Sequence, residues 1–296
     1  MPTRTRLRAR PWQVALARRD MRRLLRLIAA TDTEVRDAVL RASRGSRRIV
    51  ERLPNAGVGA TVRRAQYRIR QAELARIARR LWADDIPPRV MAGMARTSRL
   101  AVNAQRDLLA VLLRATPSGA EELGRSFLAR TGKSLEYLRS RLLNAVDLSP
   151  SVYRNASLMS GKVDAIVNEG ILLQKSAREI ASDVVGHINP RVAGGQRYAA
   201  LRLGRTELNN AFTTTSVRGY ARSPYVEGVQ WQLSGSHPRP DECDAYAQED
   251  AHGLGPGVFP ADFVPFRPHP NCYCVMIPVT PEPAEFVDRL VAGAYG

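Results

Sequence analysis

Apolar residues recur every three or four positions over most of the first 220 residues, the spacing of amphipathic helices. The first such pattern runs from Trp12 to Ile28, with arginines on its opposite face. Thr31 and Glu34 have the form of a capping box, so a second helix is expected to start there and to end near Leu53. Similar patterns predict helices over 61–82, from the break at 84–88 to about 115, and over 118–130, 134–146, 163–173, 176–185 and 198–220.

The pattern changes after residue 220. Residues 226–233 alternate and carry β-branched and aromatic side chains, which predicts a strand that contains Trp231. Residues 274–279 predict a second strand, and the chain between the two is a long loop rich in Pro and Gly. The predicted fold class is α+β. It is mostly helical, with a basic helical domain over 1–149 followed by a small α+β domain with a short antiparallel sheet over 150–296.

The charge of the chain is concentrated at one end. The net charge is +17, and residues 1–100 hold 25 Arg against 8 acidic residues, which already gives +17. This uneven distribution of charge along the chain predicts a polyanionic partner for the first third, either double-stranded DNA or an acidic protein surface. The alternative is a solvated basic helix face. The candidate contact residues are Arg18, Arg19, Arg22, Arg23, Arg63 and Arg64.

Cysteine and histidine gather in two short, proline-flanked segments, 237–243 and 269–274. These residue types are the ligands that hold zinc tetrahedrally, and neighbouring prolines stiffen the loops that present them. The predicted ligands of a structural zinc site are His237, Cys243, His269 and Cys272, with Asp241 and Cys274 in reserve. If Cys272 and Cys274 follow each other along a strand, their side chains point to opposite faces and only one joins the site. Because paired Cys-x-x-Cys knuckles are absent, a chain without metal is the alternative.

Three cysteines clustered together argue against a secreted disulfide framework. No run of about 18 apolar residues is present, so no membrane partner is expected. The basic amino terminus lacks the uninterrupted apolar stretch of a signal peptide.

Several of these features together resemble the phage Mu F-like minor head protein family. They are Arg205-Thr206-Glu207 on a helix, the strand with Trp231, the segment Asp241-x-Cys243, and the proline-rich loop into His269-Pro-Asn-Cys-Tyr-Cys274 and the last strand. The resemblance covers about residues 150–280. Tyr273 and Tyr246 stand where the family often has Arg and a further Cys, respectively.

The resemblance implies a non-enzymatic minor capsid protein that acts in head morphogenesis. Its expected partners are the portal protein and capsid or scaffold proteins, and in some relatives the packaged DNA. The expected location is the capsid interior or the portal vertex of the virion, in several copies, with assembly in the host cytoplasm.

The alternative function is a metal-dependent hydrolase, either a nuclease or a maturation protease. In that case Glu207 or Glu242 would activate a zinc-bound water, with three protein ligands on the metal. Neither a His-Glu-x-x-His helix nor a framed Ser, His and Asp set is present in the sequence, which favours the structural role.

Overall fold

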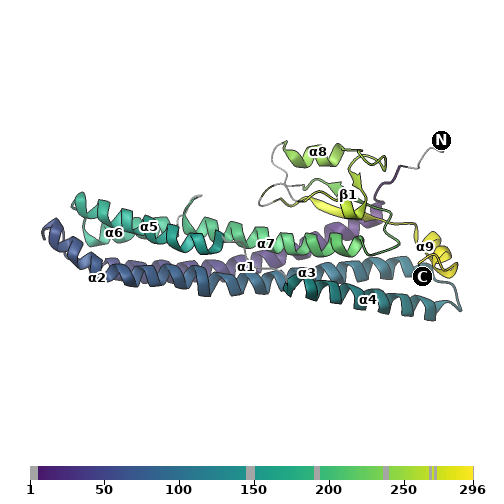
Figure 1. Ribbon diagram of the computed structural model, residues 1–296, viewed down its shortest axis with the longest axis horizontal. Coiled ribbons are helices and arrows are strands. Elements are labelled where there is room, and N and C mark those ends of the chain that lie inside the picture. The colour runs from purple at the N-terminus through teal and green to yellow at the C-terminus, as the bar shows by residue number, and fades with distance from the viewer. Residues whose placement is uncertain are drawn as a thin grey trace. The chain divides into compact units, whose positions relative to one another are not determined.

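The computed structural model describes residues 6–144, 151–189, 194–235, 240–266, 269 and 272–295, with the backbone alone for 143 and 151–153 (Figure 1). In these residues the chain is mostly helical with a small antiparallel sheet, which confirms the predicted α+β class. The elements are α1 (Pro11–Val50), α2 (Ala60–Arg79), η1 (Arg80–Asp85), α3 (Ile86–Leu112), η2 (Leu113–Ala115), α4 (Glu121–Asn144), α5 (Ser151–Leu172), α6 (Ala177–Ile188), α7 (Gly195–Tyr220), β1 (Gly228–Gln232), α8 (Glu242–Gln248), β2 (Val258–Phe259), η3 (Ala261–Phe263), β3 (Val275–Val279) and α9 (Pro283–Val291). None of the helices described combines the length and the apolarity that crossing a membrane requires.

The chain is divided into two compact units. Unit 1 comprises Met1–Leu27, Met94–Val146 and Leu208–Gly296, and unit 2 comprises Ile28–Gly93 and Asp147–Glu207. The expected domain boundary between residues 149 and 150 lies outside the described residues. Each unit draws segments from both sides of that boundary, and α1, α3 and α7 contribute residues to both units.

Helix α1 continues from Pro11 to Val50, so the prediction of a new helix at Thr31 is wrong. Thr31 is 1% exposed and lies in the helix interior between the buried residues Ile28 and Val35. A capping residue has to leave helical geometry, which would turn this apolar stripe away from the core. Continuity of the buried stripe therefore outweighs the local capping signal.

The expected breaks at 84–88 and at Thr131-Gly132 are also wrong. The backbone passes from α2 through a π-helical turn, η1, into α3. Pro87 and Pro88 directly follow this π-helical turn, and the helix continues through them although neither has an N–H to donate. In α4, Gly132 lies mid-helix, and the guanidinium of Arg106 donates to its carbonyl oxygen at 3.2 Å.

The sheet belongs to unit 1 and has the strand order β2-β1-β3, with both pairs antiparallel (Figure 1). Its two predicted strands are therefore present, as β1 and β3. Alternate residues point to opposite faces. On one face Val229, Trp231 and Met276 pack with the three cysteines, and on the other Ile277 and Val279 pack with Ala9.

Residues 7–13 are fixed to this sheet and to the loops beside it. The backbone N–H of Leu7 donates to the carbonyl of Leu254 at 2.7 Å, and that of Ala9 to the Gln230 side chain at 2.7 Å. Gln13 at the start of α1 donates to the Thr280 hydroxyl at 2.8 Å. The beginning of α1 is thus part of the unit that carries the cysteines.

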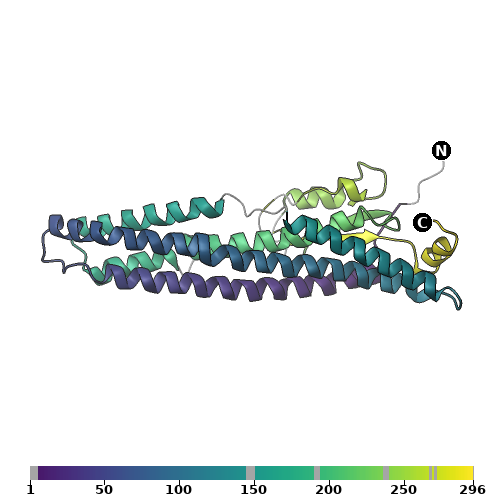
Figure 2. The same ribbon diagram turned by 60° about the horizontal axis from the view of Figure 1, so that its bottom comes forward.

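Unit 2 is helical in its described residues. Helix α5 packs against α6, labelled beside it in Figure 1, and runs alongside α2 in Figure 2. Ser176 and Glu179 form the predicted capping box at the start of α6. Gly170 permits the close packing of α5 on α6, because a Cβ there would meet the Ile180 side chain at 2.5 Å.

Candidate metal centre

Cys243 lies in the first turn of α8. This helix was not predicted, because the segment between the two strands was expected to be a loop. Asp241 caps this helix: its Oδ1 accepts from the Cys243 backbone N–H at 2.8 Å, while Asp244 accepts from the Asp241 N–H at 2.8 Å. At the other end, Gly257 adopts φ +69°, and a Cβ there would stand 2.7 Å from the Ala247 carbonyl oxygen. The helix is therefore held at both ends, and the Cys243 side chain is fully buried.

Cys272 and His269 lie on the loop that leads into β3. Because β3 pairs with β1 along its length, the sheet fixes the position where this loop ends. Asn209 of α7 donates its side-chain amide to the Cys272 carbonyl, and the Cys272 N–H donates to the His269 carbonyl at 3.4 Å. Asn209 was not foreseen, since nothing in its local sequence ties it to a loop 63 residues away.

Three of the four predicted ligands converge. The Cys243 Sγ lies 3.6 Å from the His269 Nε2 and 3.6 Å from the Cys272 Sγ, and one ligand atom from each residue falls within 4.8 Å of the others. Tetrahedral zinc with Zn–S bonds of about 2.3 Å and Zn–N bonds of about 2.0–2.1 Å places two sulfurs about 3.8 Å apart and a sulfur and nitrogen about 3.6 Å apart. The group could therefore hold a metal ion.

Without a cation this arrangement disfavours thiolates. Burial, with hydrogen bonding to Cys272, raises the pKa of the Cys243 thiol to about 12. Hydrogen bonding to Cys272, with burial, also raises the pKa of the Cys274 thiol. A divalent cation reverses this preference, because it binds the deprotonated sulfur and so releases the proton.

Cys274 packs beside Cys272, and the opposite orientation expected for two such residues on a strand does not apply. Both are at most 2% exposed and pack in one cluster with Cys243. The physical reason is that β3 begins only at Val275, which frees the residues before it from strict strand alternation.

Asp241 also contacts the imidazole. Its Oδ2 lies 3.1 Å from the His269 Nε2, while its Oδ1 caps α8. The same carboxylate therefore caps the helix that carries Cys243 and contacts the His269 nitrogen that faces the Cys243 sulfur, so a metal bound at that nitrogen would replace the contact with Asp241. His237, the remaining predicted ligand, lies outside the described residues.

The other motif residues have structural partners. Arg205 pairs with Asp32 within unit 2, with nitrogen–oxygen distances of 2.8 and 2.7 Å. Glu207 is half-buried, and burial raises the pKa of its carboxyl group. Trp231 is 2% exposed and packs edge-on against Tyr246 of α8, with ring centroids 5.1 Å apart.

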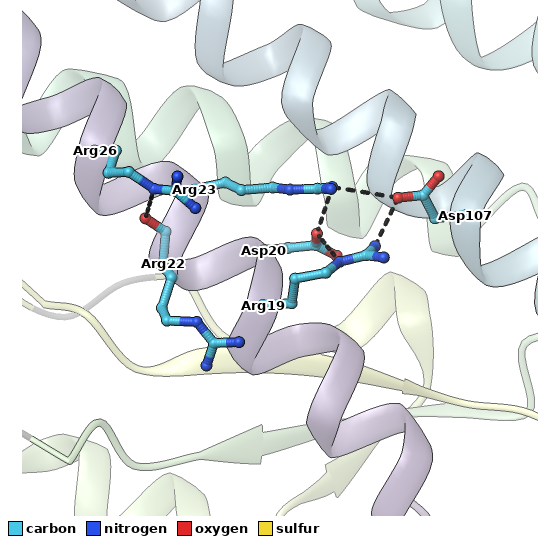
Figure 3. A network of polar contacts seen from close by, with 6 residues as sticks. All are labelled: Arg19, Asp20, Arg22, Arg23, Arg26 and Asp107. Atoms are coloured by element: carbon cyan, nitrogen blue, oxygen red, sulfur yellow. Dashed lines mark hydrogen bonds and ion pairs between the residues drawn. The ribbon is translucent and has the colours of Figure 1, made fainter.

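The predicted basic contact residues fall into three kinds. Arg18, Arg22 and Arg64 are exposed. Arg19 and Arg23 bind the carboxylates of Asp20 and Asp107, as Figure 3 shows, with distances of 2.6–3.3 Å. Arg63 is 1% exposed and donates to the Lys175 carbonyl at 2.6 Å, so its prediction as a surface contact is wrong.

Comparison of the chain with protein-family models, with curated proteins and with solved structures finds no match.

Proposed function

We propose that this chain is a minor capsid protein of phage head morphogenesis, a structural assembly factor whose carboxy-terminal module is closed by zinc. The observation that carries the proposal is the convergence of Cys243, His269 and Cys272, which come from the two segments that resemble the Mu F-like family. The polarised charge supports an acidic partner for the amino-terminal third, either a capsid or portal protein or packaged DNA.

We propose Cys274 as the fourth ligand. Cys274 is buried in the same cluster as Cys243 and Cys272, outside the group of three ligand atoms that lie within 4.8 Å of one another, and a Cys₃His set is an established structural zinc site. His237 remains the other candidate for this position. A closed set of four protein ligands leaves no place for a water nucleophile, which counts against the hydrolase alternative.

The metal would stabilise the module by closing a loop. Cys243 and Cys272 are 29 residues apart, and the segment between them contains α8, β2 and η3. Cross-linking a loop of this length lowers the conformational entropy of the unfolded chain by an amount worth about 3–4 kcal/mol.

The metal site is tested by measuring zinc by mass spectrometry and thermal unfolding by calorimetry. We expect about one equivalent of zinc, and a lower melting temperature after chelation. Cys243→Ser, Cys274→Ser and His269→Gln should each lose the metal, whereas His252→Gln, a histidine outside the group, should keep it. Retention of zinc in Cys274→Ser together with its loss in His237→Gln would assign the fourth position to His237.

The assembly role is tested separately, in phage particles. An antibody against the chain should detect it in purified virions and procapsids of the phage that encodes it, at a fixed ratio to the major capsid protein. Presence in infected-cell extract without incorporation into particles contradicts the role. Hydrolysis of DNA or capsid protein by the zinc-loaded chain, abolished by Glu207→Gln, would instead support the enzyme.

A further inference from the structure

An open groove of about 540 Å³ runs between α1 and α3 within unit 1. Its floor is apolar and is made by Trp12, Ala15 and Leu16 of α1 with Ala110 and Val111 of α3. Its rim is polar and is made by Arg19, Arg22, Asp107 and Arg114. The lining residues recur at helical spacing on both helices, so the groove follows the helices rather than crossing them.

The rim has an excess of positive charge. Three arginines stand against one aspartate, which leaves a net charge of +2 on the groove lining. Asp107 is engaged by Arg19 at 2.6 Å and by Arg23 at 3.3 Å, and Asp20 holds the same two arginines from the α1 side (Figure 3). Within the part of the chain that the structure describes, no carboxylate pairs with Arg22 or Arg114.

The network also orders Arg19, one of the three rim arginines. The Asp20 carboxylate is almost buried, and the two arginines that it holds are shared with Asp107 on the facing helix. An arginine whose side chain is already ordered loses less entropy when it meets a ligand. A second hollow of about 450 Å³, lined by Arg23, Asn103 and Arg106 among others, shares Asp107 and extends the polar surface along α3.

The apolar floor and the basic rim indicate which kind of partner fits the groove. A nucleic acid backbone offers phosphates to the arginines but nothing apolar for a floor of Trp12, Leu16 and Val111. A second copy of this chain, whose net charge is +17, would bring positive charge to a positive rim. An amphipathic helix with apolar anchors on one face and carboxylates at its edges satisfies both parts.

We propose that the α1–α3 groove binds an acidic amphipathic helix of a partner protein. The distance along α1 from Trp12 to Arg22 is about 15 Å at 1.5 Å per residue, which matches about three turns of the partner helix. The small side chains of Ala15 and Ala110 let that helix approach closely, and Arg22 and Arg114 meet its carboxylates from the two sides. This inference rests on the groove alone and not on the proposed assembly role.

The test uses the full-length protein and a fluorescently labelled helical peptide of about 18 residues, with leucines on one face and glutamates flanking them. Binding is followed by anisotropy. We expect the double variant Arg22→Glu, Arg114→Glu to weaken binding at least about tenfold, a change of about 1.4 kcal/mol. Arg141→Glu, a single charge reversal at an exposed arginine outside the groove, should change it less than about twofold. A peptide with glutamine in place of glutamate should bind weakly.

Ala15→Lys separates a seated helix from simple charge attraction. This exposed position tolerates lysine in a helix, and the change adds positive charge while it fills the floor. Weaker binding supports the proposal, whereas stronger binding overturns it. Equal losses in Arg141→Glu, or displacement of the peptide by a DNA duplex of about 20 base pairs at lower concentration, also overturn it. Self-association in sedimentation that Arg22→Glu abolishes would assign the groove to a second copy and overturn the proposal as well.

Discussion

Glu207 is a carboxylate whose ionised form is disfavoured by its surroundings. It is half-buried in α7, and burial is the cause that raises the pKa of its carboxyl group above the ordinary value of 4.5. A raised pKa in the folded state means that the native protein binds this proton more tightly than the unfolded chain does. The contribution to stability is therefore present below pH 4.5 and is lost as the pH rises through the folded pKa.

Glu207→Gln should consequently stabilise the protein at neutral pH, because glutamine removes the charge and keeps the shape. The gain in melting temperature over the wild type should be largest near neutrality and should shrink as the pH falls towards 4.5. Calorimetry of both proteins over this range checks the slope. Glu169→Gln, which removes an exposed carboxylate on α5, is the control for the loss of a charge without burial. A constant difference at every pH would contradict the assignment to burial.

Two neighbouring arginines also show that a count of charges does not predict which of them are exposed. Arg63 is buried and Arg64 is exposed, although the sequence reading gave both the same role. Arg63 shares a helix face with Tyr67 and Leu74, which are buried, whereas Arg64 is turned about 100° away. The angular positions of the two residues around the helix would have predicted that Arg63 is buried and Arg64 is exposed. The carbonyl of Lys175 that receives the Arg63 guanidinium lies 112 residues away and could not be read from the sequence.

At the scale of elements, the contact of α7 with α3 in unit 1 depends on a glycine. A Cβ at Gly219 would lie 2.1 Å from the side-chain oxygen of Gln105, which is itself 1% exposed. Thr97 of α3 joins the same two helices by donating to the Leu208 carbonyl at 3.0 Å. The two helices therefore pack with little space between them.

Gly219→Ala should lower the free energy of unfolding by about 1–3 kcal/mol, since the added methyl group forces Gln105 from its position. Gly186→Ala is the matched control, because a Cβ at Gly186 of α6 meets nothing within 4 Å. That change should be neutral or stabilise by up to about 1 kcal/mol through the higher helix propensity of alanine. Denaturant unfolding of both variants measures the contrast, and equal effects would refute it.

The elements were predictable where local signals and burial agreed. The capping box of Ser176 and Glu179 starts α6 because the chain before it leaves the core, whereas the same signal at Thr31 lies within a continuous buried stripe. The helix α8 was missed, although Asp241 and Asp244 give it a reciprocal cap that the sequence contains. The convergence of Cys243 with Cys272 was anticipated from ligand chemistry. The contribution of Asn209 was not, because it depends on tertiary packing.

At the scale of the whole molecule, the excess charge of the first 100 residues should dominate any binding of DNA. Many of these arginines are exposed, including Arg18, Arg22 and Arg64. If about five of them contact phosphates, affinity for a duplex should fall by about three powers of ten between 50 and 200 mM salt. Fluorescence anisotropy over this range measures the slope. An affinity that does not change with salt would exclude DNA as a partner of these arginines.

The discontinuity of unit 1 has a consequence for synthesis on the ribosome. Every segment of unit 2 has been translated by residue 207, whereas unit 1 joins residues 1–27 to residues 208–296. Gln13 is translated 267 positions before its hydrogen-bond partner Thr280. The first turns of α1, with their arginines and the apolar side chains that later face the sheet, therefore wait for the rest of the protein to be made, which leaves them open to chaperones and to premature encounters.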